Sequence, residues 1–247
     1  MSRPLQGFAV GALLCLAAAC ANAPRPTPTG AVPDAFVARV EALALLQTLN
    51  ADLLSHDSAT QTLERWCGDH RLAAPAKIVA ERVQGIEQAP TPEQRAELKV
   101  GPAEQVRYRR VRLRCGALVL SEADNWYVPS RLTPQMNELL ESTDTPFGKV
   151  VLPLHFQRHT LSATPLWLPL PRGWEMQGLA GERAAGGGPA GGRPAGSPAA
   201  SRDATPFQVP DKVLEHRAVL VLPDGMPISE VVETYTGNVL AFLVVNP

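Results

Sequence analysis

The strongest constraint on the fold of this chain is a segment in which arginines alternate with apolar residues. Within Val106–Arg114, the apolar residues Val111 and Leu113 are each flanked by arginines. Successive side chains of a β-strand point to opposite faces, so the pattern predicts a strand with one face in the core and an arginine-rich face in water. Sheets with one solvated face are typically antiparallel.

The other periodic segments extend this strand to an α+β fold, in which helices come first and are followed by a mainly antiparallel sheet, a further helix and more strands. From Asp34, apolar residues recur at helical spacing as far as Leu53. Ser58 with Gln61 fits a capping box at the start of a second helix, and a third is predicted over Thr133–Ser142. Strands are predicted over Lys77–Val83, Val106–Arg114, Leu118–Val128, Lys212–Leu222, Pro227–Thr236 and Val239–Val245.

A change of composition interrupts this domain. From Leu179 to Pro206 the chain consists mostly of Gly, Ala, Pro, Ser and Arg, which bury too little apolar surface to become ordered. We therefore expect a disordered insertion at 179–206. The strands after it must pair with strands before it, and a long surface loop costs little free energy, so 34–247 is predicted to be one domain.

The amino terminus has the three-part form of an export signal. Arg3 precedes an apolar run, Phe8–Ala19, that is too short to span a bilayer and is followed by Cys20. This segment resembles a bacterial lipoprotein signal, which implies acylation of Cys20 and attachment to a membrane surface. The alternative is a plain secreted protein. We expect a signal peptide at 1–20, a proline-rich tether at 21–33, and an exported protein of the cell envelope or periplasm, lipid-anchored to a bacterial membrane.

Cys67 and Cys115 are the cysteines that lie beyond this signal. In an oxidising compartment they can form a disulfide, but free cysteines are also commonly buried, so both interpretations stay open. No zinc-ligand spacing is present, and we expect no metal and no cofactor. Loop or surface positions are expected for His56, His155, His159 and His216.

Charge and motifs exclude several functions. The formal net charge is −1 over 247 residues, whereas binding to nucleic acid needs a clear basic excess, so no nucleic-acid partner is expected. The sequence contains no phosphate-binding glycine loop, no nucleophile elbow and no zinc-protease helix. The chain is expected to be monomeric.

Arg109 is unusual because its side chain falls on the same strand face as Val111 and Leu113. A buried guanidinium needs an anionic partner, since burial of an unpaired charge is unfavourable. A carboxylate matches its planar fork in a two-point contact. That carboxylate can belong to a ligand or to an internal salt bridge, and the side chain can instead reach solvent at the strand end.

Glu233 is the second charge within an apolar strand pattern, on the face of Val231 and Tyr235. Partial burial favours the protonated form of a carboxyl group and suits it to donate a proton. The alternatives are a glutamate in water on an edge strand and an ion-pair partner for Arg109.

Together these segments resemble the chorismate lyase family. The resemblance rests on their shared order and spacing along most of residues 45–245, apart from the insertion. In that family, one six-stranded antiparallel sheet with flanking helices encloses the ligand. The matching segments are Leu53–Thr60, Arg109–Leu113, Glu122–Pro129, Thr143–Gly148, Leu168–Trp174 and Gly225–Tyr235.

The resemblance implies a carbon–oxygen lyase that eliminates pyruvate from chorismate and leaves 4-hydroxybenzoate or a related aromatic acid, without a cofactor or metal. Arg109 would hold the ring carboxylate, and Glu233 would act on the ether oxygen at the opposite end. Arg110 is the alternative carboxylate ligand if the hairpin is aligned differently. Further substrate-binding positions are Phe147, Gly148 and Ala59.

Export conflicts with this activity, because chorismate is made in the cytoplasm. A second hypothesis is therefore a non-catalytic envelope lipoprotein that binds a small aromatic carboxylate through the same Arg109. A third is a structural or interaction lipoprotein of the envelope with a vestigial pocket.

Overall fold

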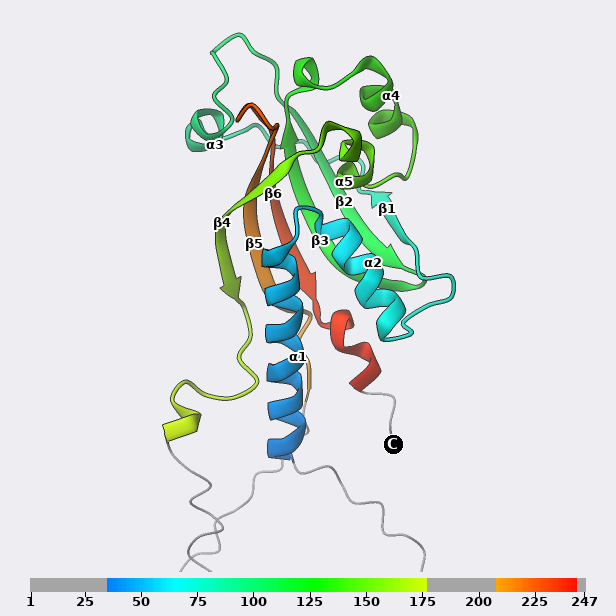
Figure 1. The fold of residues 1–247 in the computed structure, drawn as a ribbon, viewed down its shortest axis with the longest axis vertical. Helices are drawn as coiled ribbons and strands as arrows, with labels where there is room; N and C mark the ends of the chain where they lie inside the picture. The colour runs from blue at the N-terminus through cyan, green and yellow to red at the C-terminus, as the bar shows by residue number, and fades with distance from the viewer. Residues whose placement is uncertain (1–34, 177–207, 244–247) are drawn as a thin grey trace, which may run out of the picture. The chain divides into compact units, whose positions relative to one another are not determined.

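One antiparallel sheet organises the computed structural model, which describes residues 35–176 and 208–243. The strand order is β1-β2-β3-β6-β5-β4, and every neighbouring pair is antiparallel (Figure 1). The expected α+β fold with a single antiparallel sheet and flanking helices is confirmed. The strands are β1 Ile78–Arg82, β2 Arg107–Cys115, β3 Leu118–Tyr127, β4 Gln157–Pro165, β5 Lys212–Val221 and β6 Pro227–Thr236.

The sheet joins the two described parts of the chain. β6 pairs with β3, and β5 pairs with β4, so strands that follow residue 207 lie between strands that precede residue 177. This is the pairing expected around the 179–206 segment. Three predicted segments lie outside the described residues. They are the insertion at 179–206, the signal at 1–20 with Cys20, and the tether at 21–33.

Helices cover one face of the sheet. α1 and α2 lie across this face, with α4 and α5 near one end of it (Figure 1). Leu49 and Leu53 of α1 and Leu63 of α2 are buried in one cluster with Val111 and other sheet residues. The helices are α1 Ala35–Ser55, α2 Ala59–Asp69, α3 Pro92–Glu97, α4 Pro134–Ser142 and α5 Phe147–Val150, with 3₁₀ helices η1 Pro129–Arg131, η2 Leu152–Leu154, η3 Trp174–Met176 and η5 Gly237–Leu243.

A disulfide fixes α2 to the sheet. Cys67 of α2 and Cys115 at the end of β2 are bonded, with their Cα atoms 6.3 Å apart. Both cysteines are fully buried in the main core. The disulfide was one of the two interpretations left open by the sequence.

The prediction of a strand at Val239–Val245 is wrong, because this part of the chain enters η5 directly after β6. Asn238 donates its backbone N–H to Thr236 Oγ1 at 3.2 Å, and the Trp66 indole donates to the Val239 carbonyl at 2.9 Å. The sixth strand is β4, which was not predicted. All β4 residues are exposed or half-buried, so they show no apolar alternation.

No helix within the described ranges combines the length and apolar character needed to cross a membrane.

Candidate ligand-binding site

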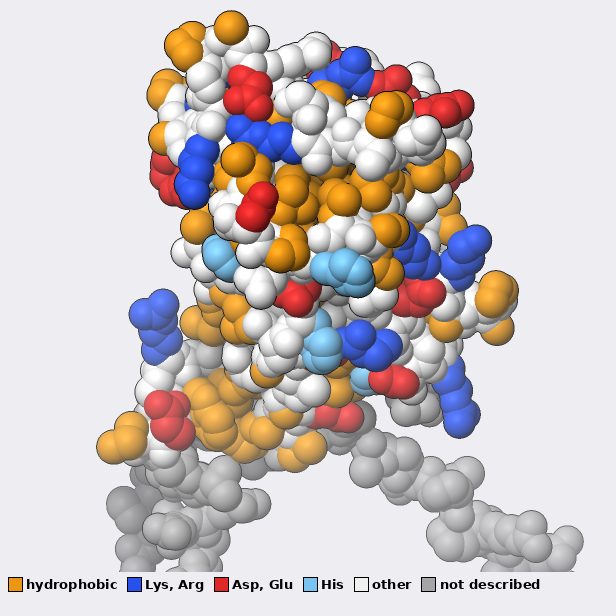
Figure 2. All heavy atoms as spheres, turned by 45° about the horizontal axis from the view of Figure 1, so that its top comes forward, with side chains coloured by type: hydrophobic (Ala, Val, Ile, Leu, Met, Phe, Trp, Pro, Cys, Tyr) orange, Lys and Arg blue, Asp and Glu red, His pale blue; other side chains and the backbone are white. Residues whose placement is uncertain are grey.

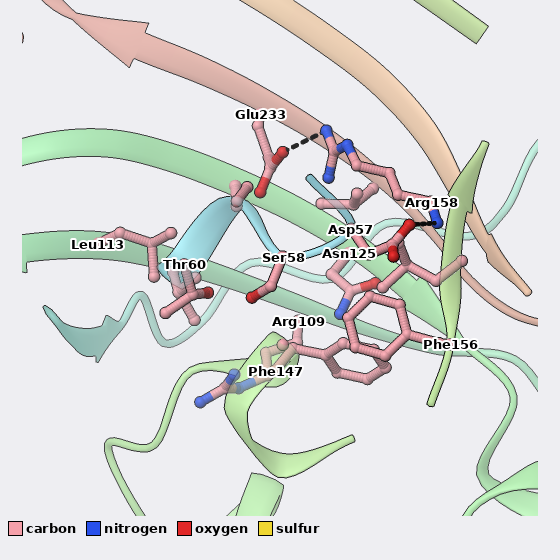
Figure 3. Close-up of a pocket in the computed structure, with 16 residues that line it drawn as sticks. Asp57, Ser58, Thr60, Arg109, Leu113, Asn125, Phe147, Phe156, Arg158 and Glu233 are labelled. Carbon is pink, nitrogen blue, oxygen red and sulfur yellow. Dashed lines mark hydrogen bonds and ion pairs between the residues drawn. The ribbon is translucent and has the colours of Figure 1, made fainter. Parts of the chain in front are cut away.

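A pocket lies on the helical face of the sheet, between the strands and the first turns of α2 and α5 (Figure 3). Four strands and the α1–α2 turn contribute polar side chains to it, and apolar side chains fill the space between them. The lining residues that matter most are Asp57, Arg109, Asn125, Phe147, Phe156, Arg158 and Glu233.

The pocket is small in this structure. Its cavity volume is about 40 Å³. A water molecule needs roughly 10–15 Å³ and a cavity that accepts benzene measures about 150 Å³, so the space holds only a few waters. Phe147 and Phe156 belong to one buried cluster and form one wall in Figure 3. An aromatic ligand therefore requires side chains such as these to move.

Arg109 enters the pocket region from β2 and is only 6% exposed. Its Nη2 donates to the Thr145 carbonyl at 3.2 Å, and its Nε is buried without a hydrogen-bond partner. Among the described residues, no carboxylate forms an ion pair with it. Burial, together with the nearby cation Arg82, lowers the pKa of Arg109 to about 10. Asp144 acts in the opposite direction without forming an ion pair, so Arg109 is a desolvated cation that makes no salt bridge within the described part of the chain.

Arg110 lies on the opposite face of the sheet. Its guanidinium approaches Glu122 and Asp124 at 3.5 Å each, and it does not line the pocket. The reason is strand alternation, because β2 keeps Arg109 on the same face as Val111. Arg110 is therefore removed from the candidate site.

Glu233 of β6 lines the same pocket as Arg109 but pairs with a different residue. Its Oε2 accepts from Arg158 Nη2 at 2.6 Å and from the Tyr235 hydroxyl at 3.1 Å. The side chains of Arg158 and Glu233 are 3% and 7% exposed. Two donors already occupy Oε2, while the other carboxylate oxygen points toward the cavity (Figure 3). Glu233, which was predicted to donate a proton, therefore accepts two hydrogen bonds at Oε2.

Arg158 is the site residue that the sequence analysis missed. It lies on β4, and Asp57 Oδ1 accepts its backbone N–H at 2.9 Å. Although burial opposes the charged form, Glu233 and Tyr235 outweigh it and raise the pKa of Arg158 above its ordinary value. Its segment, Gln157–Pro165, has no periodic pattern, so only the pairing of β4 with β5 brings Arg158 to Glu233.

His216 extends this polar cluster behind the pocket, which corrects its expected surface position. It is fully buried on β5 opposite Glu233, and its Nε2 lies 2.8 Å from Asn50 Oδ1. Burial, and secondarily Arg158, lowers the pKa of His216 to about 4. Histidines are visible at the surface in Figure 2, in agreement with the exposure of His56, His155 and His159.

Phe147, Gly148 and Ala59 line the pocket at the facing starts of α5 and α2. A Cβ at Gly148 would lie 3.2 Å from both Ser58 Oγ and Thr60 Oγ1, so glycine permits the close approach of the two helices. The first backbone N–H groups of α2 have no intrahelical acceptor and add a partial positive charge at this wall. Among the described residues, no group of three or more His, Cys, Asp or Glu is arranged to hold a metal ion.

Fold and site define an α+β domain with a small pocket whose buried arginine forms no ion pair with any carboxylate in the described ranges. No protein-family model matches the chain. The chain is 52% identical over 211 residues to "Uncharacterized protein y4mC" of Sinorhizobium fredii (strain NBRC 101917 / NGR234), which covers 85% of this chain and 81% of that protein. The chain belongs to the family of this protein.

Solved structures show partial similarity at low identity. The effector domain of PhnF from Mycobacterium smegmatis is 11% identical, with a TM-score of 0.42 over 74% of this chain and 90% of that domain. A GntR-family transcriptional regulator from Enterococcus faecalis V583 is 13% identical, with a TM-score of 0.37 over 64% of this chain and 93% of that chain. YydK from Bacillus subtilis subsp. subtilis str. 168, described as a possible transcriptional regulator, is 13% identical, with a TM-score of 0.34 over 64% of this chain. The match spans 58% of YydK.

This comparison corrects the expectation of no nucleic-acid partner. The Enterococcus faecalis structure is named as a GntR-family transcriptional regulator, YydK as a possible transcriptional regulator, and the PhnF structure as an effector domain. A formal net charge of −1 therefore does not decide whether the chain has a nucleic-acid partner.

Proposed function

We propose that this domain binds a small aromatic carboxylate and that Arg109 receives the carboxylate group. The observation that carries the proposal is a desolvated guanidinium at the pocket with an unpartnered Nε and no ion-paired carboxylate among the described residues. A ligand carboxylate supplies the missing anion in two-point geometry. The apolar wall, which includes Phe147 and Phe156, suits an aromatic ring once these side chains have moved.

The test is titration calorimetry of the purified protein with benzoate and 4-hydroxybenzoate. A charge-assisted hydrogen bond contributes about 1.5–3 kcal/mol, so Arg109→Met is expected to weaken binding by roughly 10-fold to 100-fold. Arg112→Met is the matched control, because Arg112 is on the same strand but pairs with Glu81 on the other face. Equal affinities in the wild type and Arg109→Met would exclude Arg109 as the carboxylate ligand.

A chorismate pyruvate-lyase is the second candidate function. It is supported by the position of Arg109 and Glu233 in one pocket, as the chorismate lyase resemblance implies. It ranks second because Glu233 Oε2 is already occupied by Arg158 and Tyr235. The test is release of pyruvate and 4-hydroxybenzoate from chorismate, with loss in Arg109→Met and in Glu233→Gln. Binding of 4-hydroxybenzoate without pyruvate release supports the non-catalytic binding protein.

We also propose that the domain is exported and attached to a membrane surface through Cys20. The Cys67–Cys115 disulfide supports export, because disulfides persist in oxidising compartments. The measurement is acylation of the chain in a bacterial host, which should be blocked by globomycin and by Cys20→Ser. Secretion without acylation would favour the plain secreted form.

A further inference from the structure

We propose that the pocket is built for a single negative charge, so that it selects aromatic monocarboxylates over dicarboxylates of the same size. This inference rests on the proposed binding of an aromatic carboxylate, because it specifies the ligand class of the same site. It argues against the lyase, because chorismate carries two carboxylates. The observation behind the inference is the position of Arg158 in the pocket, which was not predicted from the sequence.

The charges inside the pocket sum to one positive charge. The side chains of Arg109, Arg158 and Glu233 are buried and line the cavity, and Glu233 neutralises one of the two arginines. Asp57 is the remaining charged residue of the lining. It is exposed at the rim, where water and salt screen it, and its Oδ1 accepts the backbone N–H of Arg158.

The titratable groups packed behind the pocket add no charge near neutral pH. His216 is neutral there, because burial and then Arg158 lower its pKa to about 4. Tyr235 is also neutral, because burial, reinforced by Glu233, raises its pKa well above the ordinary value. Beside Arg109, the cation Arg82 and the anion Asp144 shift its pKa in opposite directions and their formal charges cancel, so the uncompensated charge is that of Arg109.

A ligand with one carboxylate neutralises Arg109 and leaves the Arg158–Glu233 pair intact. A second carboxylate at the far end would have to compete with Glu233 for Arg158, which would leave Glu233 buried without a partner. It would also face the free oxygen of Glu233, which points toward the cavity in Figure 3, and like charges repel. A neutral hydroxyl or amide can instead donate a hydrogen bond to that oxygen.

The test compares two probes of the same shape. Terephthalate carries two carboxylates, and 4-carbamoylbenzoate replaces the second carboxylate with a neutral amide of nearly identical size. For the wild-type protein at pH 7.5, we expect 4-carbamoylbenzoate to bind at least 10-fold more tightly than terephthalate. Because the two probes match in size, a difference reports charge.

Variants that change the charge inside the pocket test whether that charge causes the difference in affinity. Glu233→Gln raises the interior charge by one, so the preference for 4-carbamoylbenzoate should fall at least 10-fold or reverse. The double variant Glu233→Gln/Arg158→Met returns the interior to one positive charge and should restore the preference. Glu122→Gln, on the other face of the sheet, should leave the ratio of affinities unchanged.

The outcomes are distinguishable. Equal wild-type affinities for the two probes would overturn charge selection while the proposed function stood. Failure of benzoate and both probes to bind would overturn the proposed function and this inference together. If Glu233→Gln does not fold, the inference is still tested by the wild-type ratio of affinities and by the double variant, which keeps neither charge of the Arg158–Glu233 pair. A double variant that prefers terephthalate would contradict the inference.

Discussion

Arg109 and Arg110 are adjacent on β2, yet their guanidinium groups lie on opposite faces of the sheet and their pKa values shift in opposite directions. Burial and Arg82 lower the pKa of Arg109 to about 10. Burial also opposes the charge of Arg110, but Asp124 and Tyr108 outweigh it and raise its pKa. Arg110 completes a network of ion pairs, whereas Arg109 forms none with the carboxylates that the structure describes.

Replacing Arg109 with methionine should stabilise the fold while it abolishes binding. The substitution removes a desolvated cation that forms no salt bridge with any described residue, so we expect the free energy of unfolding to rise, by up to about 4 kcal/mol, the upper end for apolar replacement of buried ionic groups. Urea unfolding measures the change. Arg110→Met, which removes partly exposed ion pairs, should instead lower stability by about 1 kcal/mol or less. A less stable Arg109→Met protein would mean that an anion already compensates Arg109.

Acid should destabilise the protein through His216. Its folded-state pKa of about 4 lies below the ordinary value of 6.5, so the unfolded chain binds the extra proton between these values. Stability therefore rises with pH across this window and falls as pH drops from about 6.5 to 4, by about 2–3 kcal/mol. His216→Gln should flatten this part of the stability curve relative to wild type. Parallel curves for the two proteins would show that His216 does not titrate in this way.

Loss of the Cys67–Cys115 disulfide should lower stability. It closes a loop of 48 residues, for which restriction of the unfolded chain contributes about 4 kcal/mol. The Cys67→Ala/Cys115→Ala variant and the reduced wild-type protein should both unfold at lower urea concentration. Because α2 also lines the pocket, we expect weaker benzoate binding in both. A reductant that leaves the urea midpoint of the wild type unchanged would argue against the bond.

Gly148→Ala should perturb the pocket although alanine favours helices. The added methyl group would meet Ser58 Oγ and Thr60 Oγ1 at 3.2 Å, which is closer than ordinary contact, so α5 and α2 must separate slightly. We expect a loss of about 1 kcal/mol in stability and weaker benzoate binding. Gly101→Ala is the control, because a Cβ there meets no atom within 4 Å. Unchanged binding in Gly148→Ala would show that this wall does not contact the ligand.

Local patterns explain which parts of the fold and site were predictable. The alternation of Arg109 and Val111 against Arg110 assigned each residue to a face, because strand geometry fixes the direction of successive side chains. The same argument placed Glu233 on the inner face of β6. β4 escaped prediction because its residues are exposed or half-buried, and Val239 was misassigned because an apolar run is compatible with either a strand or a buried helix.

The sequence by itself determined the strand faces, the α+β class and the presence of an arginine and a glutamate on inward positions. These follow from interactions between residues that are close along the chain. Only the tertiary structure decided that Glu233 pairs with Arg158 rather than with Arg109, and that His216 lies buried behind them. Ion pairs between strands depend on which strands become neighbours, and that is settled by packing across the whole sheet and not by any local pattern.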